Sequence, residues 1–181
     1  MTATVQEKSE RDIVLDRLLA SHETWFDVCR DYECQGRTFP GYAEFHSHGE
    51  QYVLVKRAKL WEVDAHEYLF FHTAEHLDEA LLNDLVSFMT EEAIQKVDPQ
   101  PNHMTSYLSL VIVADEVDDE VKRQVRKTKF RRNFALGIRG WADLRLAAID
   151  LSDKSVTTNS QGKEMLATLR ANLEPPRGQQ A

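Results

Sequence analysis

The most hydrophobic run of the chain, residues 107–114, constrains the possible folds more than any other feature. It reads Tyr-Leu-Ser-Leu-Val-Ile-Val-Ala. A strand that is apolar at consecutive positions is typical of a sheet buried on both faces, because side chains alternate between the two faces. The run is also far too short to span a bilayer. We therefore expect it to be a central strand of a sheet.

Helical patterns precede and follow this strand. The first helix begins at Ser9, a residue type that caps helices, and is expected to end near Asp31. Its apolar positions recur at three- and four-residue spacing: Leu15, Leu18, Leu19, His22, Trp25, Phe26 and Cys29. Further helices are predicted over residues 77–97, 118–129 and 160–173.

Alternating or β-branched patterns predict the remaining strands. The expected ranges are 42–48, 51–61, 68–71, 134–138, 141–151 and 156–158. Turns are predicted at residues 49–50, 139–140 and 153–154, and a loop at Gly36 and Pro40-Gly41. The element order is therefore α-βββ-α-β-α-ββ(β)-α. This order indicates an α+β fold with a mixed, largely antiparallel sheet and about four helices packed against it.

Length and composition are typical of one domain. The chain has 181 residues, and we expect a disordered N-terminus over 1–8, one α+β domain over 9–174 and a flexible tail over 175–181. The first residues lack the charged and apolar regions of a secretory signal. Two cysteines, Cys29 and Cys34, form neither a disulfide framework nor a CxxC pair. These features predict a cytoplasmic protein.

Charge is distributed unevenly along the chain. The formal net charge of −8 argues against general binding to nucleic acid or to anionic membranes. Residues 122–132, here called the basic segment, nevertheless carry seven positive charges and no negative one. The rest of the chain has 15 basic and 30 acidic residues. One basic segment therefore lies within an acidic protein.

The basic segment has the periodicity of an amphipathic helix. Val121 and Val125 share one side, and the helical cations cover about 160° of arc on the other. A charged outer face is ordinary for a surface helix, but cations without an i,i+4 acid also repel one another, and a bound anion would relieve that repulsion. On the next strand, a Trp beside Arg suits a stacked base or ring. The candidate ligand-binding residues are Lys122, Arg123, Arg126, Lys127, Lys129, Arg131, Arg132, Arg139, Trp141 and Arg145.

One string matches a metal-binding motif. Residues 72–76 read His-Thr-Ala-Glu-His, the HxxEH pattern of inverted zinc peptidases. On a helix, His72 and His76 would reach one Zn²⁺, and Glu75 would activate the metal-bound water. We expect the string to span the end of a strand and the following loop, which favours a chance match.

A second pair of histidines lies on a predicted strand. His46 and His48 are two residues apart, so they share a strand face with Glu44. Together with His72 they could form a metal site, although such a face is more often polar and solvated. No metal, cofactor or catalytic residue is assigned from the sequence.

Three strings carry a resemblance to a known family. They are Arg-Thr-Phe-Pro-Gly-Tyr-Ala-Glu-Phe-His-Ser at 37–47, Tyr-Val-Leu-Val-Lys-Arg-Ala-Lys-Leu-Trp at 52–61 and Ile-Arg-Gly-Trp-Ala-Asp-Leu-Arg-Leu at 138–146. In these strings the chain resembles an uncharacterised prokaryotic family of small single-domain proteins, a domain of unknown function. The resemblance covers about residues 12–170. It implies one domain in a prokaryotic cytosol and carries no assigned chemistry.

A looser similarity, in element order alone, is to the restriction-nuclease-like fold. Nucleases of that fold hold a metal with an Asp and with a Glu-x-Lys on the third strand. Here the third strand has Glu67-Tyr68-Leu69, with Leu in place of Lys. The similarity therefore implies no active nuclease of this type.

Two functional hypotheses follow from the sequence. The first is a non-catalytic binding or regulatory module that engages an anionic partner through the basic segment. That partner would be nucleic acid, a phosphorylated metabolite or an acidic protein surface. The second is a metal-dependent hydrolase that uses His72, Glu75 and His76. We expect no cofactor and no membrane partner, and the sequence does not specify an oligomeric state.

Overall fold

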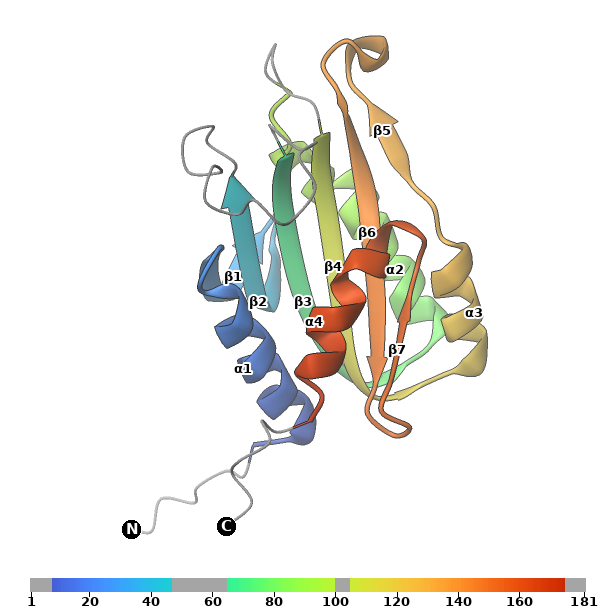
Figure 1. The fold of residues 1–181 in the computed structure, drawn as a ribbon. Helices are drawn as coiled ribbons and strands as arrows, with labels where there is room; N and C mark the ends of the chain where they lie inside the picture. Colours follow the sequence, from blue (N-terminus) through green and yellow to red (C-terminus); the bar gives the residue numbers. More distant parts are fainter. Residues whose placement is uncertain (1–7, 47–64, 100–104, 175–181) are drawn as a thin grey trace.

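A mixed sheet organises the part of the chain that the structure describes. The structure is a computed structural model that describes residues 8–46, 65–99 and 105–174. The seven strands run in the order β1-β2-β3-β4-β6-β5, with β7 also paired to β6 (Figure 1). The strands are β1 (Asp27–Cys34), β2 (Arg37–His46), β3 (Ala65–Leu77), β4 (Thr105–Val117), β5 (Arg131–Asn133), β6 (Trp141–Asp150) and β7 (Ser155–Thr158). The α-helices are α1 (Glu10–His22), α2 (Glu79–Glu91), α3 (Asp119–Lys127) and α4 (Leu166–Ala171).

The hydrophobic run forms the central strand, as predicted. β4 pairs in parallel with β3 on one side and with β6 on the other. Its residues 108–114 are all buried. The strands β1, β2 and β3 form an antiparallel meander beyond it, and β5 and β7 pair antiparallel with β6. The predicted α+β class with a mixed sheet is therefore confirmed.

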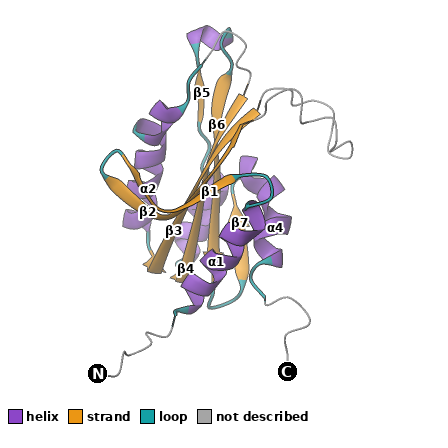
Figure 2. Cartoon of the chain, turned by 90° about the vertical axis from the view of Figure 1, so that its left-hand side faces the viewer, coloured by secondary structure: helices purple, strands orange, loops and turns teal. Residues whose placement is uncertain are grey.

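Helices cover both faces of this sheet, which explains why β4 is apolar on both sides. α2 lies on one face, and α1 and α4 lie on the other (Figure 2). Leu82 and Leu85 of α2 and Val121 of α3 belong to the apolar cluster on the first face. Leu15 of α1 and Leu169 of α4 belong to the cluster on the second face. Among the described residues, no helix has the length and apolar character of a membrane span.

The first helix is shorter than predicted. It begins as expected, with the Ser9 side chain accepting a hydrogen bond from the Asp12 amide, but it ends at His22 instead of near Asp31. Residues 27–34 form β1, because a tight turn with positive φ at Gln35 and Gly36 folds them back onto β2. Trp25, expected on the apolar helix face, is 62% exposed. The helical spacing continued by chance through Trp25 and Phe26, which lie in the turn after α1, to Cys29 in β1.

The loop predicted at Pro40-Gly41 is wrong, since both residues lie inside β2. The pairing of β1 with β2 skips Pro40 and Asp31, and Asp31 has a φ of 48°. This local break lets the strand tolerate a proline, which has no amide hydrogen to donate. At Gly41, an added Cβ would lie 2.9 Å from the Leu19 side chain, so the glycine allows α1 to pack closely.

Several other boundaries also differ from the predictions. The strand expected at 68–71 is the longer β3, and the helix expected at 77–97 is divided into α2 and a 3-10 helix over Ala93–Lys96. Ser160 makes no side-chain cap. The buried Asn159 side chain instead accepts from the Gly162 amide. The predicted strands and turn between residues 47 and 61 lie outside the described residues.

The alternation at residues 134–138 does not form a strand. These residues belong to the connection that projects at one end of the molecule between β5 and β6 (Figure 1). Leu136 and Ile138 are 99% and 82% exposed. Ala135 and Leu136 have positive φ angles of 46° and 55°, which bend the chain into a turn. The amides of Gly137 and Ile138 bond the carbonyls of Phe134 and Ala135 within this connection, as in a turn.

Candidate functional site

The helix of the basic segment docks as the sequence predicts. α3 begins after Asp118 and ends at Lys127, close to the expected bounds. Val121 and Val125 are fully buried against the sheet and α2. The cations of α3 do not all point outward, however, and the structure divides them into two groups.

Lys122 belongs to the group that is held by carboxylates. Its Nζ lies 2.6 Å from Asp150 and 2.8 Å from Asp153, and its side chain is only 12% exposed. Burial alone would lower the pKa of Lys122, but the hydrogen bonds and charges of the two carboxylates raise it. Arg123 donates hydrogen bonds to Glu120 one turn earlier. The acidic partners of Lys122 and Arg123 are therefore not i,i+4 neighbours: they come from the end of β6 and the turn after it, and from the residue three positions earlier.

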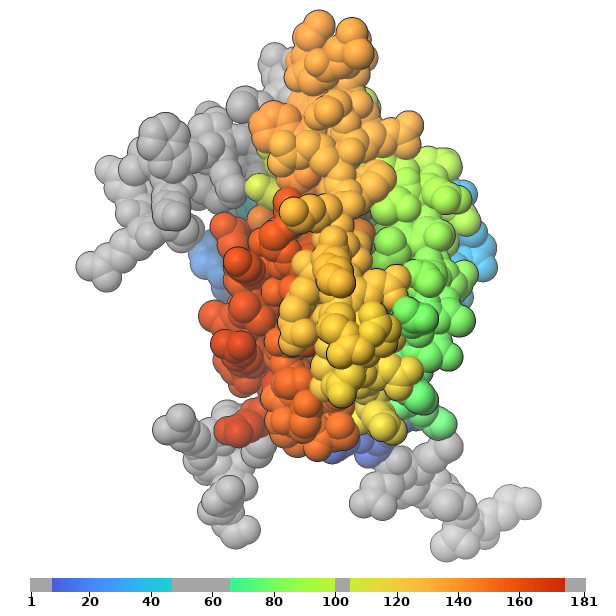
Figure 3. Space-filling model, turned by 90° about the vertical axis from the view of Figure 1, so that its right-hand side faces the viewer, coloured from blue at the N-terminus to red at the C-terminus, as the bar shows by residue number. Residues whose placement is uncertain are grey.

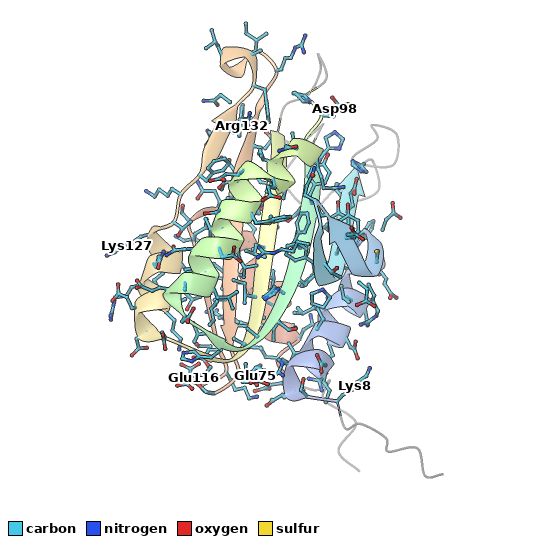
Figure 4. The ribbon with its side chains drawn as sticks, turned by 180° about the vertical axis from the view of Figure 1, so that it is seen from behind. Lys8, Glu75, Asp98, Glu116, Lys127 and Arg132 are labelled. Carbon is cyan, nitrogen blue, oxygen red and sulfur yellow. The ribbon has the colours of Figure 1, made fainter. Side chains whose placement is uncertain are left out.

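Four other cations form what we call the basic ridge: Arg126, Lys127, Lys129 and Arg132. All four are exposed. Among the described residues, none of the four has a carboxylate oxygen within 4.0 Å. The segment that carries them, from α3 into β5, runs up the middle of the face shown in Figure 3. Lys127 and Arg132 mark the same segment in the view from behind (Figure 4).

The remaining candidates lie around β6. Arg131 makes two 2.7 Å hydrogen bonds to the Asp143 carboxylate, through Nε and Nη2. Its guanidinium lies 5.0 Å from the centre of the Trp141 ring, so part of that ring is already covered. Arg139 is exposed in the projecting connection. Trp141 and Arg145 share a face of β6, because they are separated by an even number of residues.

Arg145 was a candidate from the sequence, but it is buried, and the residues that surround it were not identified. Its side chain is 9% exposed, and its Nη1 lies 3.2 Å from the Glu67 carboxylate. The Ser109 hydroxyl donates to the other oxygen of Glu67 at 2.5 Å. The guanidinium stacks on Tyr107 with its carbon 3.4 Å from the ring centre, and its Nη2 lies 3.3 Å from Glu164. The residues missed were Glu67, Tyr107, Ser109 and Glu164.

These side chains come together because β3, β4 and β6 are adjacent parallel strands. The sheet register pairs Glu67 with Tyr107, and Ser109 with Arg145. The available signal was a polar residue inside an apolar strand, such as Ser109 within the hydrophobic run. Such residues need hydrogen-bond partners when buried, so two of them on neighbouring strands indicate a polar site.

A cavity of about 250 Å³ opens beside Arg145. Its polar lining comes from His22, Glu67, Arg145, Glu164 and Thr168. Its apolar lining comes from Phe26, Leu69, Val111, Met165 and Leu169. A pocket that combines an apolar wall with a few convergent polar groups is the usual form of a small-molecule site.

The HxxEH string does not have the geometry of a zinc peptidase. All five residues lie in β3, so the expectation of a strand end followed by a loop is wrong. On a strand, residues four apart are separated by about 13 Å, and Glu75 points to the opposite face from His72 and His76. His76 instead bonds Asp118 at 2.7 Å, and Glu75 pairs with Arg11 at 3.4 Å. Desolvation lowers the pKa of His72.

The second histidine pair is only partly described, because His48 lies outside the described residues. Glu44 bonds His46, and His46 Nδ1 lies 2.7 Å from His66 Nδ1. Burial would raise the pKa of Glu44, but hydrogen bonds from Tyr42 and His46 and the charge of Lys96 lower it. Among the described residues, no group of three or more His, Cys, Asp and Glu side chains is arranged to hold a metal ion.

Lys96 lies in a tyrosine cage next to this pair. Its Nζ is 2.7 Å from the Tyr32 hydroxyl and 5.2–5.7 Å from the ring centres of Tyr32, Tyr42 and Tyr68. Cation–π attraction and the nearby Glu44 carboxylate hold this ammonium. The cage thus binds a cation of the chain itself.

Comparison with known proteins identifies the family but not an activity. A family model described as a domain of unknown function (DUF8052) matches residues 10–171. No curated protein and no solved structure matches the chain significantly. The predicted resemblance to a domain of unknown function is therefore confirmed, while the prokaryotic origin stays a prediction. Because the match spans most of the chain, the protein belongs to the DUF8052 family.

Proposed function

We propose that the protein is a binding module for an anionic macromolecule and that the basic ridge is its contact surface. The observation that carries the proposal is four exposed cations between the end of α3 and β5, none with a carboxylate oxygen within 4.0 Å among the described residues. Elsewhere in the described chain, many cations are paired: Lys8, Arg11, Arg30, Arg37, Lys96 and Lys154 all have carboxylates within 4.0 Å.

Electrostatics supports an anionic partner of limited extent. Like charges on one surface repel one another, and a bound anion removes this repulsion. The rest of the chain is strongly acidic, with a net charge of −8 for the whole protein. A long polyanion would therefore be repelled beyond the ridge, so the contact is local and depends on salt.

Recognition at this surface depends on charge more than on aromatic stacking. The Trp141 ring is half-buried and carries the Arg131 guanidinium on it, which leaves less of the ring free for a nucleic-acid base. Lys122 and Arg123 are engaged by carboxylates, so the contact surface is narrower than the whole basic segment. The partner class is a short polyanionic stretch, with nucleic acid as the first probe.

Fluorescence anisotropy with labelled single-stranded DNA, RNA and heparin tests the proposal. The variant Arg126→Glu/Lys127→Glu should weaken binding at least tenfold. With about four phosphates neutralised, the wild-type affinity for a single strand should fall about fiftyfold between 50 and 200 mM salt.

A matched control separates a specific surface from general charge. Lys163 and Arg170 are exposed cations outside the basic segment, and the variant Lys163→Glu/Arg170→Glu changes the net charge by the same amount. This control should bind like the wild type. Equal weakening by both double variants, or no binding of any probe at low salt, would show that the ridge is an ordinary solvated surface. The cytoplasmic location stays a prediction.

A further inference from the structure

We infer that the cavity beside Arg145 binds a small organic carboxylate with an apolar body. This site is separate from the basic ridge, and it would serve a small ligand instead of a macromolecule. The inference depends on how Arg145 is held, on which of its hydrogen-bond donors remain unused and on the lining of the cavity.

Arg145 is rigidly positioned before any ligand arrives. Its side chain is 9% exposed, with Glu67 on Nη1 and the Tyr107 ring stacked against the guanidinium. Glu67 is itself fixed by the Ser109 hydroxyl. A donor group held in this way loses little conformational entropy when it binds, which favours affinity.

One edge of the Arg145 guanidinium is poorly satisfied. The Nε–H and one Nη2–H of an arginine point the same way and together match the two oxygens of a carboxylate. In Arg145, Nη2 has a single contact at 3.3 Å to Glu164, and the buried Nε has no hydrogen-bond partner among the described residues. In Arg131, the same edge makes two 2.7 Å hydrogen bonds to Asp143. The donor pair of Arg145 therefore lacks the carboxylate that completes the pair of Arg131.

Glu164 is the group that a ligand would displace. Its side chain is 75% exposed, so it can return to water at little cost. The ligand carboxylate would then replace the charge of Glu164, and Arg145 would lie between two carboxylates, those of Glu67 and of the ligand. The charge balance of the site is unchanged by this exchange.

The cavity determines the size and character of the rest of the ligand. Its volume is about 250 Å³. A cavity of about 150 Å³ accepts benzene, so this one has room for a single ring or a short branched chain next to the carboxylate. The side chains of Phe26, Leu69, Val111, Met165 and Leu169 would contact that apolar body. Benzoate is accordingly a suitable first probe.

Titration of the isotopically labelled protein, followed by amide chemical shifts, tests the inference. Benzoate should shift amides of β6 near Arg145 and of the segment from Glu164 to Leu169. Benzyl alcohol and benzylamine, of similar size, should bind at least tenfold more weakly, since they cannot accept two hydrogen bonds on one edge. Equal binding of benzoate and benzyl alcohol, or no saturable shift with benzoate, would overturn the inference.

Two variants give opposite expected results. Arg145→Lys keeps the charge but removes the paired donors, and it should weaken benzoate binding at least tenfold. Glu164→Ala removes the competing carboxylate and should tighten binding roughly two- to fivefold. Glu33→Ala, an exposed carboxylate on β1, is the matched control and should change nothing. If Arg145→Lys fails to fold, the benzoate affinity of Glu164→Ala decides whether the inference holds. An affinity equal to or weaker than that of the wild type contradicts it.

The Arg126→Glu/Lys127→Glu variant should bind benzoate like the wild type. A failure of the basic ridge to bind nucleic acid would therefore not affect the benzoate result, and a failure of benzoate to bind would not affect the test of the ridge.

Discussion

The basic ridge and the Arg145 site both depend on cationic side chains, but they use them in opposite ways. The ridge cations are exposed, and none of them has a carboxylate oxygen within 4.0 Å among the described residues. Arg145 is buried between carboxylates that come from β3 and from the segment before α4. The comparison teaches that a count of charges along the chain does not tell which cations are free. Their partners come from elements far away in sequence.

The strongest way to test this contrast is to remove the buried cation. Arg145→Met should lower the free energy of unfolding by about 3–5 kcal/mol, because it leaves the Glu67 carboxylate without its partner. Adding Glu67→Gln should restore part of this loss, since the unpaired charge is then removed. Urea denaturation of both variants measures the effect. A loss below about 1 kcal/mol would mean that Arg145 behaves like a surface cation.

A second test measures how stability depends on pH through the ion pair of Lys122 and Asp150. Burial would raise the pKa of Asp150, but hydrogen bonds from Lys122 and Ser152 and the positive charge of Lys122 lower it below the ordinary value of 3.8. A lowered folded-state pKa stabilises the protein above the unfolded pKa, and this contribution is lost as pH falls through the folded pKa. We expect a loss of about 1–3 kcal/mol below about pH 4.

The comparison for this test is Lys122→Met, measured by urea denaturation from pH 3 to pH 7. The variant should be less stable than the wild type at neutral pH and should lose less on acidification. Parallel curves for the two proteins would argue against the pair as the source of the acid sensitivity.

The projecting connection beyond the ridge offers a smaller effect of opposite sign. Leu136 is 99% exposed and has a φ of 55°, a backbone conformation that Asn adopts more easily than Leu. Leu136→Asn should therefore raise the free energy of unfolding by about 0.5 kcal/mol. Thermal unfolding measures it, with Ile138→Asn as the control at negative φ. A destabilised Leu136→Asn protein would indicate that the leucine is in contact with another part of the molecule.

The smallest expected effect is on the ridge itself. Arg126→Gln and Lys127→Gln should each change the free energy of unfolding by less than about 0.5 kcal/mol, because exposed charges contribute little to folding. Urea denaturation at low salt is the measurement. A larger loss in either variant would show that ridge cations, like Lys122, stabilise the fold.

Local patterns predicted the parts of the fold that depend on neighbours in sequence. The hydrophobic run became the central β4, and Ser9 and Asp118 preceded helices as expected. The first helix was predicted nine residues too long, ending at Asp31 instead of His22, because only pairing with β2 reveals that residues 27–34 are extended. The same limit applies to the basic segment. Its excess of cations is evident in the sequence, but the carboxylates that pair with Lys122 are not.

The sequence by itself therefore determined the fold class, the central strand, the docking face of α3 and the position of an unusually basic surface. Each of these depends on periodicity within about twenty residues, which a single segment carries on its own. The tertiary structure alone decided that Lys122 is paired, that the HxxEH string lies along a strand and that Glu67, Ser109, Arg145 and Glu164 meet at one cavity. The physical reason is that strand register and helix packing bring together side chains up to about a hundred residues apart, and no local pattern records which of them will meet.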